Sequence, residues 1–136
     1  MEQTERPEHA ARDAAKDRAE SLTKDQKIRS RGDFKRTYAQ GRKVFGRTLV
    51  LFLRPNGLSS ARLGVTVTRR VGTAVVRNLL RRRVREIYRR GPRPPAGHDL
   101  VVNLRESAAA APFAELSADF ERTLARAIRQ VAEVRG

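Results

Sequence analysis

The chain has 136 residues, no cysteine and a net charge of +15, so it suits one small domain and excludes disulfides and thiolate chemistry. Residues 30–98 hold eighteen basic residues and two acids, whereas the segments on either side are nearly balanced. Such a block is typical of a surface for a polyanion, with nucleic acid the first candidate and an anionic membrane the second.

No apolar run approaches the roughly 20 residues that span a bilayer, and we expect a cytoplasmic protein. Residues 1–27 carry mixed charge and almost no large apolar side chain. Such a segment buries too little surface to offset its ordering entropy, which predicts a disordered tail. Residues 28–136 remain as a single domain.

The first helix is predicted over Arg31 to Gln40. Ser30 followed three residues later by an acid is typical of a helix start, and Gly41 follows its end. Phe34 and Tyr38 lie four residues apart and therefore share one side of this helix. Core packing is the ordinary explanation of such a pair.

Two strands are predicted next, Val44 to Arg54 and Arg62 to Thr68, separated by a turn at residues 55–57. Alternation gives each strand one strongly apolar face. The residues of that face are Leu49, Leu51, Leu53, Leu63, Val65 and Val67. The opposite face is smaller and more polar, and it is predicted to be an open surface carrying Phe52, Thr66 and Thr68.

A second helix follows, with Thr73 as a candidate N-cap. Helical spacing predicts one broad apolar sector. Its residues are Val76, Leu79, Leu80, Val84, Ile87 and Tyr88. The opposite side carries Asn78, Arg81, Arg82, Arg85 and Arg89, with Arg77 at its border. Because few acids are placed to pair with these arginines, a bound polyanion explains the face better than solvation alone.

The chain closes with a strand, Asp99 to Leu104, and a long helix, Phe113 to Val134. The order helix-strand-strand-helix-strand-helix predicts an α+β fold, an α/β sandwich with helices over the apolar sheet face. The sequence places no second histidine near His98, and no protein catalytic constellation or metal site is predicted. Arginine forks and aromatic rings instead favour RNA binding.

The second helix resembles the RNR signature of the bacterial ribonuclease P protein subunit. The family pattern is AVxRNxxKRxxRE, and this chain reads AVVRNLLRRRVRE from Ala74 to Glu86, with Arg81 in place of the lysine. The resemblance extends to the segments RSRGDFKRTYAQGR, LVLFLRPN, LGVTVTRRVG and HDLVVNLR, and covers roughly residues 22–130.

The resemblance implies a fold like the second domain of ribosomal small-subunit protein five, with a left-handed βαβ crossover. It implies a subunit that joins a catalytic RNA to remove the 5′ leader from precursor tRNA. The residues that it assigns to the catalytic RNA are Arg77, Asn78, Arg81, Arg82 and Arg85, to which the charge pattern adds Arg89. The residues that it assigns to a leader cleft are Phe34, Tyr38, Phe52, Thr66, Thr68 and Arg70, with Arg47 and Arg69 as weaker neighbours.

The resemblance further implies Mg²⁺ held mainly by RNA phosphates, and no catalytic group in the protein. We expect a monomer apart from the RNA, and no membrane partner. Two alternatives stay open: a general RNA-binding or ribosome-assembly protein, and a membrane-surface protein that uses the basic helix. The membrane alternative ranks last because the core needs the apolar side of that helix.

Overall fold

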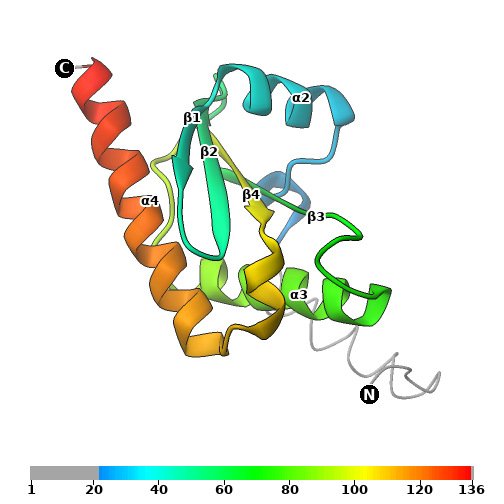
Figure 1. Cartoon of the computed structure of the whole chain (residues 1–136). Coiled ribbons are helices and arrows are strands. Elements are labelled where there is room, and N and C mark those ends of the chain that lie inside the picture. Colours follow the sequence, from blue (N-terminus) through cyan, green and yellow to red (C-terminus); the bar gives the residue numbers. More distant parts are fainter. Residues whose placement is uncertain (1–21, 136) are drawn as a thin grey trace.

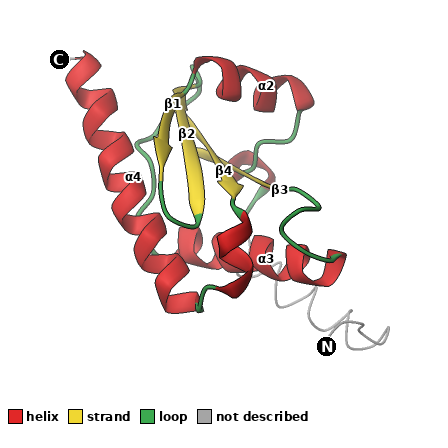
Figure 2. Cartoon of the chain, in the orientation of Figure 1, coloured by secondary structure: helices red, strands yellow, loops and turns green. Residues whose placement is uncertain are grey.

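The computed structural model describes residues 22–135, which form an α+β fold around a mixed four-stranded sheet (Figure 1). The strands are β1 (Arg42–Phe45), β2 (Leu49–Pro55), β3 (Arg62–Val67) and β4 (His98–Leu104). The helices are α2 (Arg31–Gln40), α3 (Ala74–Arg90) and α4 (Phe113–Arg135), with short 3-10 turns η1 (Lys24–Gln26) and η2 (Glu106–Ala110). Figure 2 shows the strands enclosed by these helices.

The sheet has the strand order β1-β2-β4-β3. The β1–β2 and β2–β4 pairs are antiparallel, and β3 pairs with β4 in parallel. Helix α3 connects the two parallel strands, which confirms the predicted βαβ crossover; its left hand stays a prediction. In the part of the chain described, no helix is both long enough and apolar enough to span a bilayer.

The single strand predicted over Val44 to Arg54 is wrong, because the chain turns back on itself within it. Residues 46–48 form a hairpin turn between β1 and β2, in which Gly46 N donates to Leu49 O at 2.7 Å. Asp119 of α4 supports this turn by accepting hydrogen bonds from the backbone N–H groups of Arg47 (3.2 Å) and Thr48 (2.7 Å). A carboxylate 71 residues away thus satisfies donors that the turn leaves open.

The predicted faces of the sheet are confirmed. The leucines of β2 and β4 and the apolar residues of β3 pack with α3 and α4 in the main core. Val50, Phe52 and Val101 lie on the opposite face in a second cluster with Ile28, and Phe34 of α2 packs against it. The prediction that this second face is open is therefore wrong over part of its area, because α2 covers it.

Helix α3 is amphipathic as predicted, with one exception. Leu80, Val84, Ile87 and Tyr88 are buried, and Val76 packs against the core. Leu79 was expected in the same sector but is 42% exposed, on the side of the helix that also carries the exposed Val75. The buried sector is narrower than predicted, and it faces the main neighbours of α3, which are β3, α4 and η2.

The predicted tail of residues 1–27 is wrong for its last six residues. Leu22 is buried in the main core, and Ile28 N donates to Leu63 O at 2.9 Å beside a parallel bridge between Lys27 and Leu63. The turn at residues 24–26 is closed by Gln26, whose side chain accepts from Thr23 N at 2.8 Å. The rest of the predicted tail, residues 1–21, lies outside the described residues.

Asp119 should make stability sensitive to acid. Burial alone would raise the pKa of this carboxyl group, but hydrogen bonds from Thr48 and Arg47 outweigh burial and hold it below the ordinary 3.8. A folded-state pKa below the unfolded one stabilises the protein above pH 3.8, and this stabilisation is lost as pH falls through the folded value. We expect Asp119→Asn to cost about 1–2 kcal/mol near neutral pH.

This difference should shrink as pH falls below 3.8, because the carboxyl group is protonated first in the unfolded chain and then in the folded protein. Urea denaturation of both proteins at about pH 6 and about pH 3 measures it. A difference in unfolding free energy that is the same at both pH values would contradict the role assigned to the carboxylate.

Candidate nucleic-acid interface

The outward side of α3 presents a guanidinium face. Helix α3 begins at the N-cap Thr73, whose hydroxyl accepts from Val76 N at 3.3 Å. Along the helix, Asn78, Arg82 and Arg85 are exposed, and Arg81 is partly exposed. Arg81 Nη1 donates to Asn78 Oδ1 at 2.8 Å, so these two predicted residues lie side by side.

The charge on this face is unevenly compensated. Glu86 pairs with Arg89 and, at 2.6 Å, with Arg90 Nε, which offsets part of the charge at the C-terminal end. Partial burial of the Arg85 guanidinium, and then the charge of Arg81, lower the pKa of Arg85. A phosphate placed between these two arginines would relieve that repulsion.

Arg77 has a different environment from the central arginines. Its side chain is partly buried, and its Nε donates to Gly72 O at 3.1 Å. The contact holds the guanidinium at the start of α3, at the border of the guanidinium face as predicted. Arg77 therefore fixes the loop that enters the helix as well as adding charge.

The predicted aromatic residues meet between α2 and the second sheet face. Tyr38 and Phe52 form an edge-to-face pair with ring centroids 4.8 Å apart, and the Tyr38 hydroxyl lies 2.7 Å from Thr66 Oγ1. Phe34 packs against the cluster that contains Phe52 and lies over Gly64; a Cβ on Gly64 would lie 2.6 Å from the Phe34 ring. Glycine is thus what lets the ring approach this strand.

Phe52 does not lie on an open surface as predicted. It is only 6% exposed, because α2 and the ring of Tyr38 cover it. Tyr38 is the exposed member of the pair. Of this ring pair, Tyr38 is therefore the member available for base stacking, while Phe52 packs against its ring.

Sequence reasoning missed three residues on the sheet face that carries Phe52. Strand pairing places Asn103 opposite both Val50 and Thr66, on the same sheet face as the aromatic pair. On the edge strand, the Lys43 ammonium lies 4.9 Å from the ring centroid of Phe45 and 5.6 Å from that of Phe52. Alternation along β1 would have revealed Lys43 and Phe45 if the hairpin had been recognised.

The remaining predicted cleft residues lie beyond the end of β3. Strand β3 stops at Val67, and Thr68, Arg69 and Arg70 are exposed in the loop that leads to α3. They line a hollow of about 750 Å³ whose other wall includes Asn103 and Arg105. The two loop arginines thus lie between β3, which carries Thr66, and the start of α3, which carries the guanidinium face. The structure does not bring Arg47 to this hollow; it lines another, beside α4.

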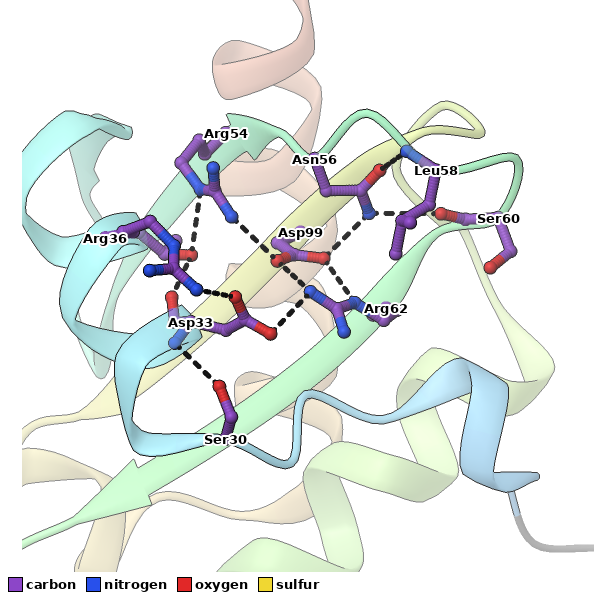
Figure 3. A network of polar contacts seen from close by, with 10 residues as sticks. Ser30, Asp33, Arg36, Arg54, Asn56, Leu58, Ser60, Arg62 and Asp99 are labelled. Atoms are coloured by element: carbon purple, nitrogen blue, oxygen red, sulfur yellow. Dashed lines mark hydrogen bonds and ion pairs between the residues drawn. The ribbon is translucent and has the colours of Figure 1, made fainter.

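A polar network around the buried Asp99 links α2 to the sheet (Figure 3). Asp99 is fully buried and accepts from Arg62 at 2.8 and 2.7 Å, from Asn56 at 2.8 Å and from Arg54 at 3.3 Å. Arg62 also pairs with Asp33 of α2 at 3.1 Å. One arginine therefore links the first turn of α2 to the sheet.

Possible metal ligands do not cluster in residues 22–135. No group of three or more histidine and acidic residues in this range is arranged to hold a metal ion. His98 is buried, and its Nδ1 lies 3.3 Å from Ala96 O. The chemistry that the described residues offer is binding by arginine, amide and aromatic groups.

The fold and these surfaces define a small, basic α+β protein with an arginine face suited to a polyanion. The model of the family Ribonuclease P matches residues 22–128. The ribonuclease P protein component of Thermotoga maritima is 39% identical over 104 residues, covering 76% of this chain and 82% of the relative. That of Acidothermus cellulolyticus is 43% identical over 103 residues, covering 74% and 86%.

Solved structures agree with these relatives. The RNase P protein of Staphylococcus aureus superposes with a TM-score of 0.70 at 28% identity, covering 75% of this chain and 94% of that one. The RNase P protein of Thermotoga maritima gives a TM-score of 0.67 at 33% identity, covering 74% and 96%. The chain belongs to the ribonuclease P protein family. It is the protein component of a ribonucleoprotein endoribonuclease that processes tRNA, in which RNA carries the catalytic role.

Proposed function

We propose that this protein uses two separate RNA surfaces within ribonuclease P. The guanidinium face of α3 binds the catalytic RNA, and the cleft between α2 and the sheet binds the single-stranded 5′ leader of precursor tRNA. The single observation that carries the proposal is that the exposed arginines of α3 and the Tyr38–Phe52 ring pair form two separate surfaces, with the exposed loop of Arg69 and Arg70 between β3 and α3. The protein thereby raises substrate affinity and assists removal of the leader.

The two surfaces differ in the chemistry they offer. Guanidinium groups spaced along a helix pair with phosphates and are suited to the backbone of a folded RNA. The exposed ring of Tyr38 beside Lys43 and Asn103 is suited to an unpaired base, which offers a π face and polar edges. Folded RNA hides its bases in stacks, so the cleft favours a single strand.

We also propose how magnesium is held, where the protein acts and whether it forms oligomers. Magnesium is held mainly by phosphates of the RNA, because its preferred ligands are oxygens and water. The protein acts in the cytoplasm as a monomer apart from the RNA, and without a membrane partner. A general RNA-binding protein is the second candidate, favoured by the sequence-tolerant chemistry of the arginine face; it differs in being indifferent to the leader.

Replacing Tyr38 by alanine should weaken recognition of the leader. Base stacking on an aromatic ring contributes roughly 1–3 kcal/mol, so the preference of the holoenzyme for precursor over mature tRNA should fall about tenfold. Tyr38→Phe keeps the ring but loses the hydroxyl contact with Thr66, and most of the preference should remain. Equilibrium binding of both tRNA forms to the reconstituted holoenzyme measures the effect, and equal losses for precursor and mature tRNA would argue against leader stacking.

A further inference from the structure

A second basic surface lies on α4, away from the guanidinium face. Arg122, Arg126 and Arg129 are four and three residues apart and therefore share one side of the helix. All three are exposed. Together with Arg47 of the β1–β2 turn they border a hollow of about 570 Å³. We call these four residues the α4 arginine surface.

An exposed aromatic ring connects this surface to the leader cleft. Phe45 is 56% exposed and lines the same hollow. Its ring also lies under Lys43, whose ammonium is within reach of Phe52 in the cleft. The edge strand β1 thus lies between the α4 arginine surface and the leader cleft. A strand of RNA that leaves the cleft across β1 would meet Phe45 first.

Hydrogen bonds hold this border in a defined position. Arg126 Nη2 donates to Phe45 O at 2.6 Å, which fastens α4 to the edge strand. On the other side, Arg105 Nη1 donates to the carbonyl of Gly46 at 2.9 Å. The turn is therefore tied both to the α4 arginine surface and to the hollow beside Asn103.

The hollow is lined by four arginines and one acid, so its net charge is positive. Asp119 is buried, and its oxygens accept hydrogen bonds from Thr48 and from the backbone of Arg47. Its contact with Arg122 is long, at 3.6 Å, and the arginine side chain there is mostly solvent-exposed. Positive charge beside an exposed ring is the combination that binds single-stranded nucleic acid.

From this continuity we infer that the α4 arginine surface and Phe45 bind leader nucleotides that lie upstream of those in the cleft. The inference rests on the proposed leader role of the cleft. Arginines contact the phosphates, and the Phe45 ring stacks on a base as the strand crosses β1. The surface thus extends recognition to longer leaders, and short leaders do not reach it.

A leader-length series tests the inference with the reconstituted holoenzyme. Single-strand sites span roughly 4–16 nucleotides, so precursor tRNAs with leaders of about 5 and about 15 nucleotides are compared with mature tRNA. Wild-type protein should bind the long-leader form more tightly than the short one. The double variant Arg122→Ala/Arg129→Ala should lose that additional affinity, several-fold, while binding the short-leader form normally.

The salt dependence gives a second readout. Each single-strand phosphate contact contributes about 0.7 to the log–log salt slope, so the double variant should lower the long-leader slope by about 1.4 in magnitude. Glu121→Gln, an exposed neighbour on the same helix, is the matched control and should leave the length dependence intact. Thermal melting checks that each variant is folded.

The outcomes separate this inference from the cleft proposal. An equal loss for both leader lengths, or no loss for either, overturns the α4 assignment. If wild-type holoenzyme fails to prefer even the short-leader precursor over mature tRNA, the cleft proposal itself fails. If the wild-type holoenzyme binds the long-leader precursor no more tightly than the short-leader precursor, only the extension to α4 is overturned.

Discussion

Asp99→Ala should destabilise the protein by about 3–5 kcal/mol, the usual effect of removing one partner from a buried ion pair. The carboxylate is fully buried and holds Arg62 through two hydrogen bonds, with Asn56 and Arg54 as further donors. Alanine leaves these donors without their acceptor in a region that water reaches poorly. Urea denaturation measures the loss of unfolding free energy.

The matched control is Asp33→Ala in the same network. Asp33 pairs with Arg62 and Arg36, but its carboxylate is partly exposed, so its loss should cost only about 1 kcal/mol. Because Asp33 is the contact from α2, this milder variant should also weaken discrimination between precursor and mature tRNA. Equal stability losses for the two variants would contradict the ranking by burial.

Replacing Arg81, Arg82 and Arg85 together by alanine should sharply weaken association with the catalytic RNA. If about five phosphates are neutralised by the wild type, its log–log salt slope should be roughly −3.5 to −4.5. Removing three contacts should reduce that slope by about 2–3 in magnitude and lower affinity by roughly tenfold per arginine. Titration of the catalytic RNA at several salt concentrations measures both quantities.

The fold should tolerate this triple change, because alanine favours helix and none of the three side chains is buried in the core. Val75→Ala alters an exposed apolar side chain of the same helix and serves as the control. A triple variant with wild-type affinity and salt slope would show that α3 does not bind the catalytic RNA.

Local patterns predicted the elements that depend on neighbouring residues. The caps Ser30 and Thr73 accept the expected backbone N–H groups, and helix α2 runs over Arg31–Gln40 as predicted. Strand alternation placed the leucines of β2 in the core because a pleated strand turns successive side chains to opposite faces. Residue periodicity therefore determined the sheet faces correctly.

The errors arose where distant segments decide the structure. The hairpin at residues 46–48 lacks the Asn-Gly or Asp-Gly signal and depends on Asp119. Burial of Phe52 depends on α2 crossing the second face, and burial of Leu22 on a short segment docking beside β3. Neither contact produces a periodic pattern of residues in the sequence.

In the candidate site, too, local patterns predicted some residues, while others depend on contacts between distant segments. The guanidinium face followed from helical spacing, whereas the leader residues were assigned through the family resemblance. Asn103 lies in a strand whose sequence is almost continuously apolar, so it was not predicted as a site residue. Its pairing with β2 and β3 places it on the sheet face that carries Phe52 and Thr66. Lys43 and Phe45 required knowledge of an edge strand that the sequence did not reveal.

The central claim is that the protein recognises the leader while bound to the catalytic RNA. Its most direct test is the affinity of the catalytic RNA for precursor and mature tRNA at low magnesium, with and without the protein. The account predicts that the protein strengthens precursor binding by a larger factor than mature tRNA binding. The same factor for both tRNA forms would contradict it and would favour a general RNA-binding role.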